Sequence, residues 1–403
     1  MPELPRAKTP APGVSKLRLL QRPFDCHPER NVASCTVGCS QTIIVETFSH
    51  NIGGNALSHA EGKLRIAIDA MGGDFAPRNE VQGAVEVLRQ TGNRFEVVLV
   101  GREEAIRSEL AKTDTDGLSL SVVPANDVIE MHDSPVVALK QKPDSSLVVG
   151  VMLLKENKVD AFVSAGNTGA VTAASTLLLG RIRGVSRPTV AAIFPSETGP
   201  TLIVDAGAVT DCKPHFLFEF GVMGSIYSEY VFKKKNPRVG LLNVGEEESK
   251  GDELTKEAYA KFIAGKNRVN FIGNIEGRDI LQGKADVVVC DGFLGNVLLK
   301  FAESVPSFLK VKFKNYAAEG PLQKVLMGLL RNPLRKIFKD FDYQEFGGVP
   351  LLGVNGVTII GHGSSTPKAM RNMILRAEEM VNKKINFHIE QSLRDNSSEG
   401  LNG

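Results

Sequence analysis

Several residue types are scarce in this chain, and each scarcity excludes a class of function. Tryptophan is absent and aromatic residues make up 6 % of the 403 residues, so the stacking platforms that bind single-stranded nucleic acid are not supported. The net charge of +2 gives no general electrostatic argument for a nucleic-acid partner. Five cysteines are too few for a disulfide framework and favour a reducing, cytoplasmic setting. No run of 18 apolar residues occurs, so we expect no membrane-spanning helix.

Residues 1–62 differ in composition from the rest of the chain. They carry several prolines, scattered charge and no sustained hydrophobic periodicity, which predicts a disordered extension or an upstream start that is not translated. The apolar stretch of a secretory signal is missing. Cys26, His27, Cys35 and Cys39 could form a zinc site, but their spacing is irregular and no Cys-x2-Cys pair occurs. Residues 391–403 are predicted to form a polar, disordered tail.

From residue 64 onward, short apolar runs alternate with helical patterns, which predicts an α/β domain over residues 63–390. We expect three α/β/α layers with a mostly parallel sheet. The predicted strands are 64–68, 95–100, 118–123, 161–164, 190–194, 201–204, 239–242, 269–272, 287–289 and 357–360. The predicted helices are 79–89, 103–111, 145–155, a helix ending at 179, 213–231, 252–264, 296–312 and 366–387.

The first strand leads into a turn that resembles an anion site. Asp69, Gly72, Gly73 and Asp74 end the apolar alternation, and Pro77 opens the helix that follows. A Gly-Gly turn before a helix start presents backbone N–H groups at the positive end of a helix dipole. The pattern is neither a Walker loop nor a GxGxxG fingerprint. A tight turn without a ligand remains the alternative.

Four further turns share this small, Gly-rich composition. They span residues 164–169, 205–208 with 211–214, 291–296 and 361–365. Turns of this kind are Gly-rich for conformational reasons alone, but five of them predict a common purpose. We expect all five at one edge of the sheet, where they form a cleft for a phosphate and a polar acyl donor. Lys142 and Lys213 could add positive charge there.

Two other stretches have open interpretations. Residues 243–251 hold three consecutive acids after a strand and are either a lid, a metal site or a solvated loop. Residues 321–341 repeat apolar side chains at helical spacing among lysines and arginines, which predicts a basic amphipathic helix kinked near Pro333. Such a helix fits an anionic membrane surface or a partner groove. A dimer-interface or core-packing helix is the alternative.

The ordered motifs resemble the phosphate acyltransferase PlsX family (acyl-ACP:phosphate acyltransferase). The resemblance covers residues 64–387 and departs from the family at Val209, where the family has Asn. The matching motifs are DAMGGD (69–74), K with DSS (142 and 144–146), VSAGNTGA (163–170), DCKP (211–214), MGS (223–225), NVGE (243–246), CDGF with GN (290–293 and 295–296), PLLGVNG (350–356) and HGSS (362–365).

The resemblance implies transfer of a fatty acyl chain from acyl carrier protein to inorganic phosphate. The acyl phosphate would feed the first acylation of glycerol 3-phosphate, by a glycerol-3-phosphate acyltransferase, in phospholipid synthesis. The resemblance also implies a cytoplasmic homodimer bound peripherally to the inner face of the cell membrane. The implied fold is similar to those of phosphate acetyltransferases and of isocitrate and isopropylmalate dehydrogenases. Neither a metal nor an organic cofactor is implied.

Phosphate is ionised near neutral pH, so the protein's main task is to position it and to stabilise an oxyanion. No acyl-enzyme is required, and nothing marks Cys212 or Cys290 as activated. Asn167 or Ser365 would polarise the thioester carbonyl, Lys213 would hold the phosphate, and His362 would move a proton or serve a structural role. The residues expected to bind phosphate or substrate are Asp69, Gly72, Gly73, Asp74, Lys142, Ser164, Gly166, Thr168, Gly169, Asp211, Asn296, Gly363 and Ser364.

Three other functions are compatible with parts of the sequence. One is a short-chain phosphate acetyl- or butyryltransferase that uses coenzyme A. Another is a β-decarboxylating dehydrogenase, although no convincing adenine-binding pattern occurs. The third is a non-enzymatic, membrane-attached scaffold for lipid synthesis, which leaves the five turns unexplained. An acidic carrier protein needs a basic surface, for which Lys310, Arg331, Arg335 and Lys336 are candidates.

Overall fold

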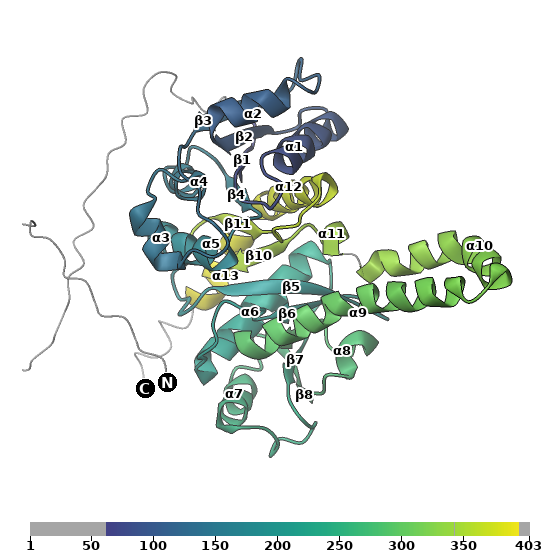
Figure 1. Ribbon diagram of the computed structural model, residues 1–403. Coiled ribbons are helices and arrows are strands. Elements are labelled where there is room, and N and C mark those ends of the chain that lie inside the picture. Colours follow the sequence, from purple (N-terminus) through teal and green to yellow (C-terminus); the bar gives the residue numbers. More distant parts are fainter. Residues whose placement is uncertain (1–61, 342, 395–403) are drawn as a thin grey trace, which may run out of the picture. The chain divides into compact units, whose positions relative to one another are not determined.

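Eleven strands form one mixed sheet in the part of the chain that the structure, a computed structural model, describes: residues 62–341 and 343–394 (Figure 1). Seven neighbouring strand pairs are parallel and three are antiparallel. In spatial order the strands are β3 (Leu120–Pro124), β2 (Glu96–Gly101), β1 (Arg65–Asp69), β4 (Ala161–Ser164), β11 (Val357–Ile360), β10 (Val349–Leu352), β5 (Thr189–Ser196), β6 (Gly199–Val204), β9 (Val287–Val289), β7 (Arg238–Leu242) and β8 (Asn270–Ile275).

Helices cover both faces of this sheet, because neighbouring side chains on each strand point to opposite sides. Ile66 and Ile68 of β1 belong to one apolar core and Ala67 belongs to the other. The first core includes α1 (Arg78–Thr91), α2 (Glu103–Leu110), α6 (Pro214–Val231), α7 (Glu253–Ala264), α12 (Pro367–Asn382) and α13 (Ile385–Arg394). The second includes α3 (Pro135–Gln141), α4 (Ser146–Lys155), α5 (Thr168–Ala174) with its π-helical extension η1 (Ser175–Leu179), α8 (Asp279–Gln282) and α9 (Gly292–Ala318). The prediction of three α/β/α layers with a mostly parallel sheet is confirmed.

Every predicted strand is present, and so are the predicted helices, with one exception. Ser145 is the N-cap of α4, and its hydroxyl accepts a bond from Val148 N at 3.4 Å. The predicted single helix 366–387 is wrong, because Lys384 has φ of 50° and separates α12 from α13. Four short elements were not predicted, namely α3, α8, β10 and a helix over Tyr343–Phe346.

The direction of the strands changes halfway across the sheet. Antiparallel pairing occurs between β11 and β10, between β10 and β5, and between β5 and β6. Three reversals leave β6, β9, β7 and β8 running opposite to β1, β4 and β11. The prediction that all five Gly-rich turns share one edge is therefore wrong. The turns after β1, β4 and β11 share one edge, and those after β6 and β9 lie at the other.

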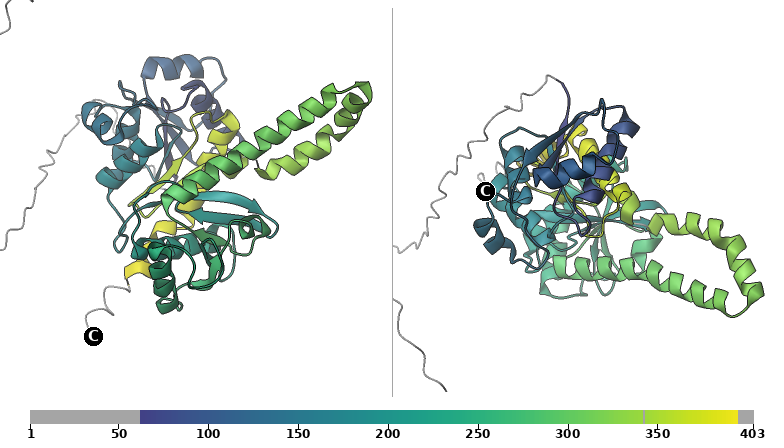
Figure 2. Two further views of the ribbon diagram at one scale, coloured as in Figure 1. Left: turned by 60° about the horizontal axis from the view of Figure 1, so that its bottom comes forward. Right: turned by 45° about the horizontal axis from the view of Figure 1, so that its top comes forward.

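The helix α9 continues beyond the sheet and pairs with α10 (Pro321–Ile337), as Figures 1 and 2 show. A short 3-10 turn, η2 (Phe338–Phe341), and α11 (Tyr343–Phe346) lead back to β10. The predicted amphipathic helix is present in α10, with Pro333 inside it. The core-packing alternative is wrong for this helix, because Leu322, Val325 and Leu329 are 76 %, 61 % and 74 % exposed. Among the described helices, none is both long and apolar enough to cross a membrane.

Candidate active site

The turns after β1 and β4 meet at the carboxyl edge that these strands share. Ser164 ends β4, donates its hydroxyl to Asp69 Oδ2 at 2.8 Å and accepts a bond from Gly166 N at 3.0 Å. A Cβ atom on Gly72 would lie 2.5 Å from Asp69 Oδ2 and 2.9 Å from Gly166 N. The two backbones can approach this closely only because neither glycine carries a side chain.

The turn after β11 joins the same group through backbone and side-chain bonds. Asp74 N donates to Gly363 O at 2.8 Å, and Asn79 Nδ2 donates to Ser365 O at 2.9 Å. A third bond, from Gly361 N to Ser164 O at 2.8 Å, links β11 to β4. Three of the five predicted turns therefore form one continuous surface, which we call the three-turn site (residues 69–74, 164–169 and 361–365).

The predicted catalytic side chains of the three-turn site are engaged in local bonds. The amide of Asn167 donates to the carbonyl oxygens of Glu130, Met131 and Asp133 at 3.1 to 3.2 Å. Its Oδ1 atom accepts from Ala170 N at 3.0 Å and so caps α5. These bonds use the donors that Asn167 would need to polarise a carbonyl, so its role here is to hold the loop 130–133 against α5.

Ser365 and His362 are both bonded within the turn that follows β11. The buried Ser365 hydroxyl donates to His362 O at 2.6 Å, which uses its only hydrogen-bond donor. The exposed His362 ring lies with Nδ1 2.7 Å from Ser364 Oγ. The ring remains on the solvent side of the turn, where a proton can reach it.

The other predicted residues of this edge differ in how accessible they are. Lys142 Nζ is bound to Asp133 Oδ2 at 2.5 Å and to Val128 O at 2.8 Å, so it braces the loop that Asn167 holds. The Lys142 ammonium lowers the pKa of Asp133 through its hydrogen bond, and the backbone N–H of Glu130 lowers it further. Thr168 and Gly169 are exposed in the first turn of α5, where backbone N–H groups have no intrahelical acceptor.

A buried acid that the sequence analysis missed lies beneath the Gly-Gly turn. Glu80 is 1 % exposed, and a Cβ atom on Gly73 would lie 2.2 Å from its Oε1 atom. Burial raises the pKa of Glu80 to about 8, its own backbone N–H opposes the shift, and the charges of Asp69 and Asp74 add to it. Burial also raises the pKa of Asp69. The signal was present, because position 80 shares a helix face with the apolar residues Ala84 and Val87.

The turns after β6 and β9 form a second group at the other edge. Asp205 is fully buried and accepts bonds from Val190 N, Ala208 N and Val209 N at 2.8, 2.9 and 2.6 Å. Asn296 lies next to Gly207, whose Cβ atom would be 3.4 Å from the Asn296 Cβ. The departure from the family pattern at Val209 leaves the turn intact, because the backbone of this residue makes the bond.

Neither cysteine of the second group is an activated nucleophile. Burial and the charge of Asp205 raise the pKa of the Cys212 thiol to about 12, and burial raises the pKa of Cys290 as well. Both thiols are protonated at neutral pH, and a protonated thiol is a poor nucleophile. Asp211 and Lys213 are exposed beside them, before and at the start of α6.

The substitution Lys213→Ala tests whether phosphate binds at the three-turn site or at the turns after β6 and β9. Lys213 follows β6 and so stands at the opposite edge from the three-turn site, and we revise its expected role accordingly. An exposed cation at that position is screened by solvent, so the Michaelis constant for phosphate is expected to stay within about twofold of the wild-type value. Steady-state kinetics measures this constant. A rise of about tenfold or more would place the phosphate at the second group instead.

Two remaining stretches were considered as metal sites, and one of them lies in the described residues. The acidic loop 243–251 is partly neutralised by Lys284, whose Nζ donates to Glu246 Oε1 at 2.6 Å. Within residues 62–341 and 343–394, no three His, Cys, Asp or Glu side chains gather as metal ligands would. The zinc ligands considered at Cys26, His27, Cys35 and Cys39 lie outside the described residues.

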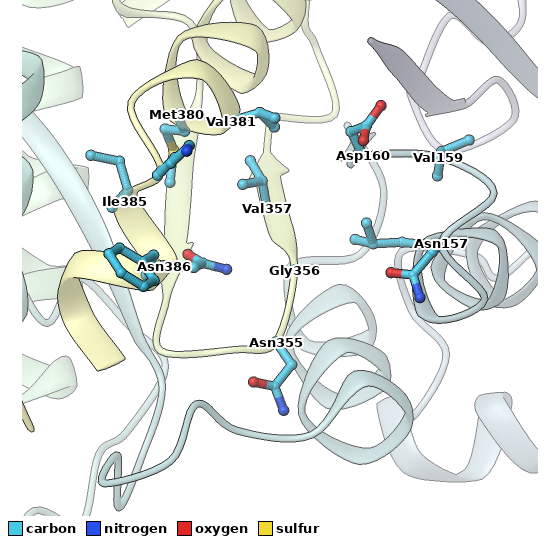
Figure 3. A pocket seen from close by; sticks show the side chains of 13 residues that line it. Asn157, Val159, Asp160, Asn355, Gly356, Val357, Met380, Val381, Ile385 and Asn386 are labelled. Carbon is cyan, nitrogen blue, oxygen red and sulfur yellow. The ribbon is translucent and has the colours of Figure 1, made fainter. Parts of the chain in front are cut away.

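A cavity of about 280 Å³ lies at the amino ends of β4 and β11 (Figure 3). Asn157 and Asp160 line one side, Asn355 and Val357 lie in the middle, and Asn386 of α13 faces them from the other side. None of the predicted site residues lines this cavity. Ligands of parallel sheets bind at the carboxyl ends of strands, so we assign the candidate active site to the three-turn site.

The architecture resembles that of solved α/β structures. A phosphotransacetylase from Streptococcus pyogenes superposes with a TM-score of 0.52 at 17 % identity, over 82 % of this chain and 94 % of that one. The EutD phosphotransacetylase from Staphylococcus aureus gives 0.51 at 15 % identity, over 79 % and 94 %. At these identities the likeness establishes the fold, which is that of the phosphotransacetylases.

The family follows from sequence. The chain belongs to the family described as "Fatty acid synthesis protein", which matches residues 64–388. Phosphate acyltransferases from Chlorobaculum parvum and Halothermothrix orenii are 48 % and 47 % identical to it. Each alignment covers 82 % of this chain and 99 % or 98 % of the relative. The resemblance to the PlsX phosphate acyltransferases is confirmed, and the protein is an acyltransferase of this family.

Proposed function

We propose that this protein transfers a fatty acyl group from acyl carrier protein to inorganic phosphate, and that residues 63–390 form the catalytic domain. A phosphate oxygen attacks the thioester carbonyl carbon, the carbon–sulfur bond breaks, and the thiolate of the carrier leaves and takes up a proton. The products are acyl phosphate and free carrier thiol. Family membership and the convergence of three Gly-rich turns support this reaction.

The single observation that carries the proposal is the close approach of the turns at Gly72 and Gly166. This approach brings the backbone N–H groups of Gly72 and Gly73 near those of residues 167–169, while the N–H groups of Asp74 and Gly166 hold the turns together. Backbone N–H groups at a helix start bind oxyanions without a positively charged side chain. Such groups would hold the phosphate and stabilise the oxyanion that forms on the carbonyl.

His362 is the side chain of this surface that is suited to move a proton. Its ring is exposed at the rim, and the two ring nitrogens of an imidazole can accept and donate a proton. A leaving thiolate needs a proton, and we assign its delivery to His362, with Ser364 orienting the ring. The reaction so described requires no metal and no organic cofactor.

The test is phosphate-dependent release of thiol from palmitoyl carrier protein. Purified full-length protein is mixed with the acylated carrier, with and without phosphate, and free thiol and acyl phosphate are measured. We expect release only with phosphate, and little with acetyl-coenzyme A in place of the carrier. Preference for acetyl-coenzyme A would favour a short-chain phosphate acyltransferase. Oxidation of isocitrate with a nicotinamide would favour the dehydrogenase, and no activity at all would overturn the proposal.

We further propose that the protein works as a homodimer at the inner face of the cell membrane, where a glycerol-3-phosphate acyltransferase consumes its product. The exposed apolar face of α10, defined by Leu322, Val325 and Leu329, supports a peripheral membrane contact. Lys324 and Arg331 are exposed on the same helix and would favour anionic lipid. The surface that binds acyl carrier protein is proposed to include the exposed residues Lys310, Arg331 and Lys336, together with Arg335.

Replacing Leu322, Val325 and Leu329 with serine is expected to abolish most sedimentation with anionic liposomes. The change removes apolar area that membrane insertion would bury, at about 1.5 to 3 kcal/mol for each side chain. Thiol release in solution should change little. Ile263→Ser, on an exposed position of α7, is the control. If liposome binding persists and light scattering shows monomers instead, the face is a subunit interface.

A further inference from the structure

A buried acid beneath Gly72 and Gly73 of the three-turn site has no role in the proposed reaction. Glu80 lies in the first turn of α1, and its Oε1 atom would lie 2.2 Å from a Cβ on Gly73. Its Oε2 atom is buried and has no hydrogen-bond partner among the described residues. A buried carboxylate oxygen without a partner costs free energy, so this position needs a reason beyond packing.

The charged groups that face Glu80 are of one sign. Asp69 comes from the end of β1 and Asp74 from the turn above. On α12, which packs along α1, the cations are directed elsewhere: Lys368 Nζ bonds to Glu345 at 2.5 Å, and Arg371 lies beside Asn372. The third turn contributes His362, whose ring lies against Ser364. No described cation therefore compensates a negative charge on Glu80.

This arrangement conflicts with an oxyanion site unless the acid is neutral. Phosphate bound to the backbone N–H groups of Gly72 and Gly73 would lie directly over the Glu80 carboxyl. A neutral carboxylic acid leaves the attraction of the N–H groups intact. A carboxylate adds a second negative charge at close range in a poorly solvated place, where repulsion is strong.

We propose that Glu80 is a positioning residue for phosphate that depends on its own proton. When Glu80 is protonated, the backbone N–H groups of Gly72 and Gly73 bind the anion. When Glu80 is ionised, its negative charge repels the anion. The inference rests on the proposed function, because it places phosphate on that same turn. The protonated state is the resting one at neutral pH, since burial raises the pKa of Glu80 to about 8. Phosphate affinity should therefore fall as the pH rises past that value.

The test measures binding with sulfate, which stays a dianion across the whole pH range and so reports on the protein alone. Sulfate is used as a competitive inhibitor against phosphate between pH 6.5 and about 9.5. In the wild type the inhibition constant is expected to be flat below the transition and to rise by about tenfold per pH unit above it. In Glu80→Gln, which cannot ionise, the inhibition constant is expected to stay flat across this range. Glu86→Gln changes an exposed acid on the same helix and should behave as the wild type.

Two outcomes overturn the inference while the proposed function stands. One is thiol release with a sulfate constant that does not change with pH in the wild type. The other is a rise with pH that Glu80→Gln leaves unaltered, which would assign the titration to another group. Stabilisation of the fold by inorganic phosphate, followed by thermal melting over the same pH range, gives the same comparison without acyl transfer. A pH-dependent stabilisation lost in Glu80→Gln, in protein that releases no thiol, would support the inference and refute the proposed reaction.

Discussion

The free energy of unfolding of Glu80→Gln, compared with that of the wild type, is expected to rise by about 3 kcal/mol from pH 5 to pH 8. No contact elsewhere in the protein needs to change. The effect comes from one proton. Glu80 is 1 % exposed, and its pKa in the folded protein is about 8 compared with 4.5 in its ordinary state. The folded protein therefore holds a proton that the unfolded chain has already released.

The sign follows from which state binds the proton. Below pH 4.5 both states are protonated, and Glu80 adds its full contribution to stability. As the pH rises from 4.5 to about 8, the unfolded chain gains from ionisation while the folded chain does not, and stability falls by about 1.4 kcal/mol per pH unit. Above that window both states are ionised and the loss is complete. Glutamine has no proton to lose and removes this slope.

Chemical denaturation of the wild type and Glu80→Gln at pH 5, 6, 7 and 8 measures the difference directly. The comparison between the two proteins cancels the titration of other buried acids, such as Asp205. Glu86→Gln, on the exposed face of α1, should show the wild-type slope. Parallel curves for wild type and Glu80→Gln would mean that Glu80 is ionised in the folded state, and its place beneath the Gly-Gly turn would then be only structural.

Local chemistry made much of this fold predictable. Strands and helices follow from apolar periodicity, and the caps at Ser145 and Asn167 follow from side chains that accept backbone N–H bonds. The reversal of strand direction was not predictable in the same way. It depends on β10, a strand of four residues, and on the pairing of β5 with β10, which is far away in the sequence. Pairing is a tertiary property that no local pattern encodes.

The candidate site shows the same division between local and tertiary information. The glycines at positions 72, 73 and 166 stand where backbones approach, and their residue type marks them in the sequence. The partners of Asn167 cannot be recognised in the sequence, because the carbonyl oxygens that accept bonds from its amide belong to the distant residues 130–133. Glu80 was missed for a related reason: an acid in the first turn of a helix is ordinarily a solvent-exposed complement to the dipole. The one local sign of its burial was its position on the same helix face as Ala84 and Val87.

Gly72→Ala is expected to lower kcat/KM for phosphate by about 100-fold, since a displacement of about 1 Å in a positioning element has this effect. The new Cβ atom would lie 2.5 Å from Asp69 Oδ2 and 2.9 Å from Gly166 N. Neither neighbour can yield at small cost. Asp69 is buried and bonded to Ser164 at 2.8 Å, and Gly166 N is backbone. The turns must therefore move apart, which separates the two runs of N–H groups.

The expected loss of activity comes from steric contact and not from backbone strain, because Gly72 is not among the glycines with positive φ. Overpacking of this kind costs about 1 to 3 kcal/mol of stability, so the protein should still fold at low temperature and the activity loss should be measurable. Gly277→Ala is the matched control: nothing lies within 4 Å of its Cβ position, and its φ is also not positive. It should keep full activity. If Gly72→Ala also keeps full phosphate-dependent thiol release, the meeting of these two turns is a feature of the fold, and the phosphate must bind at the turns after β6 and β9.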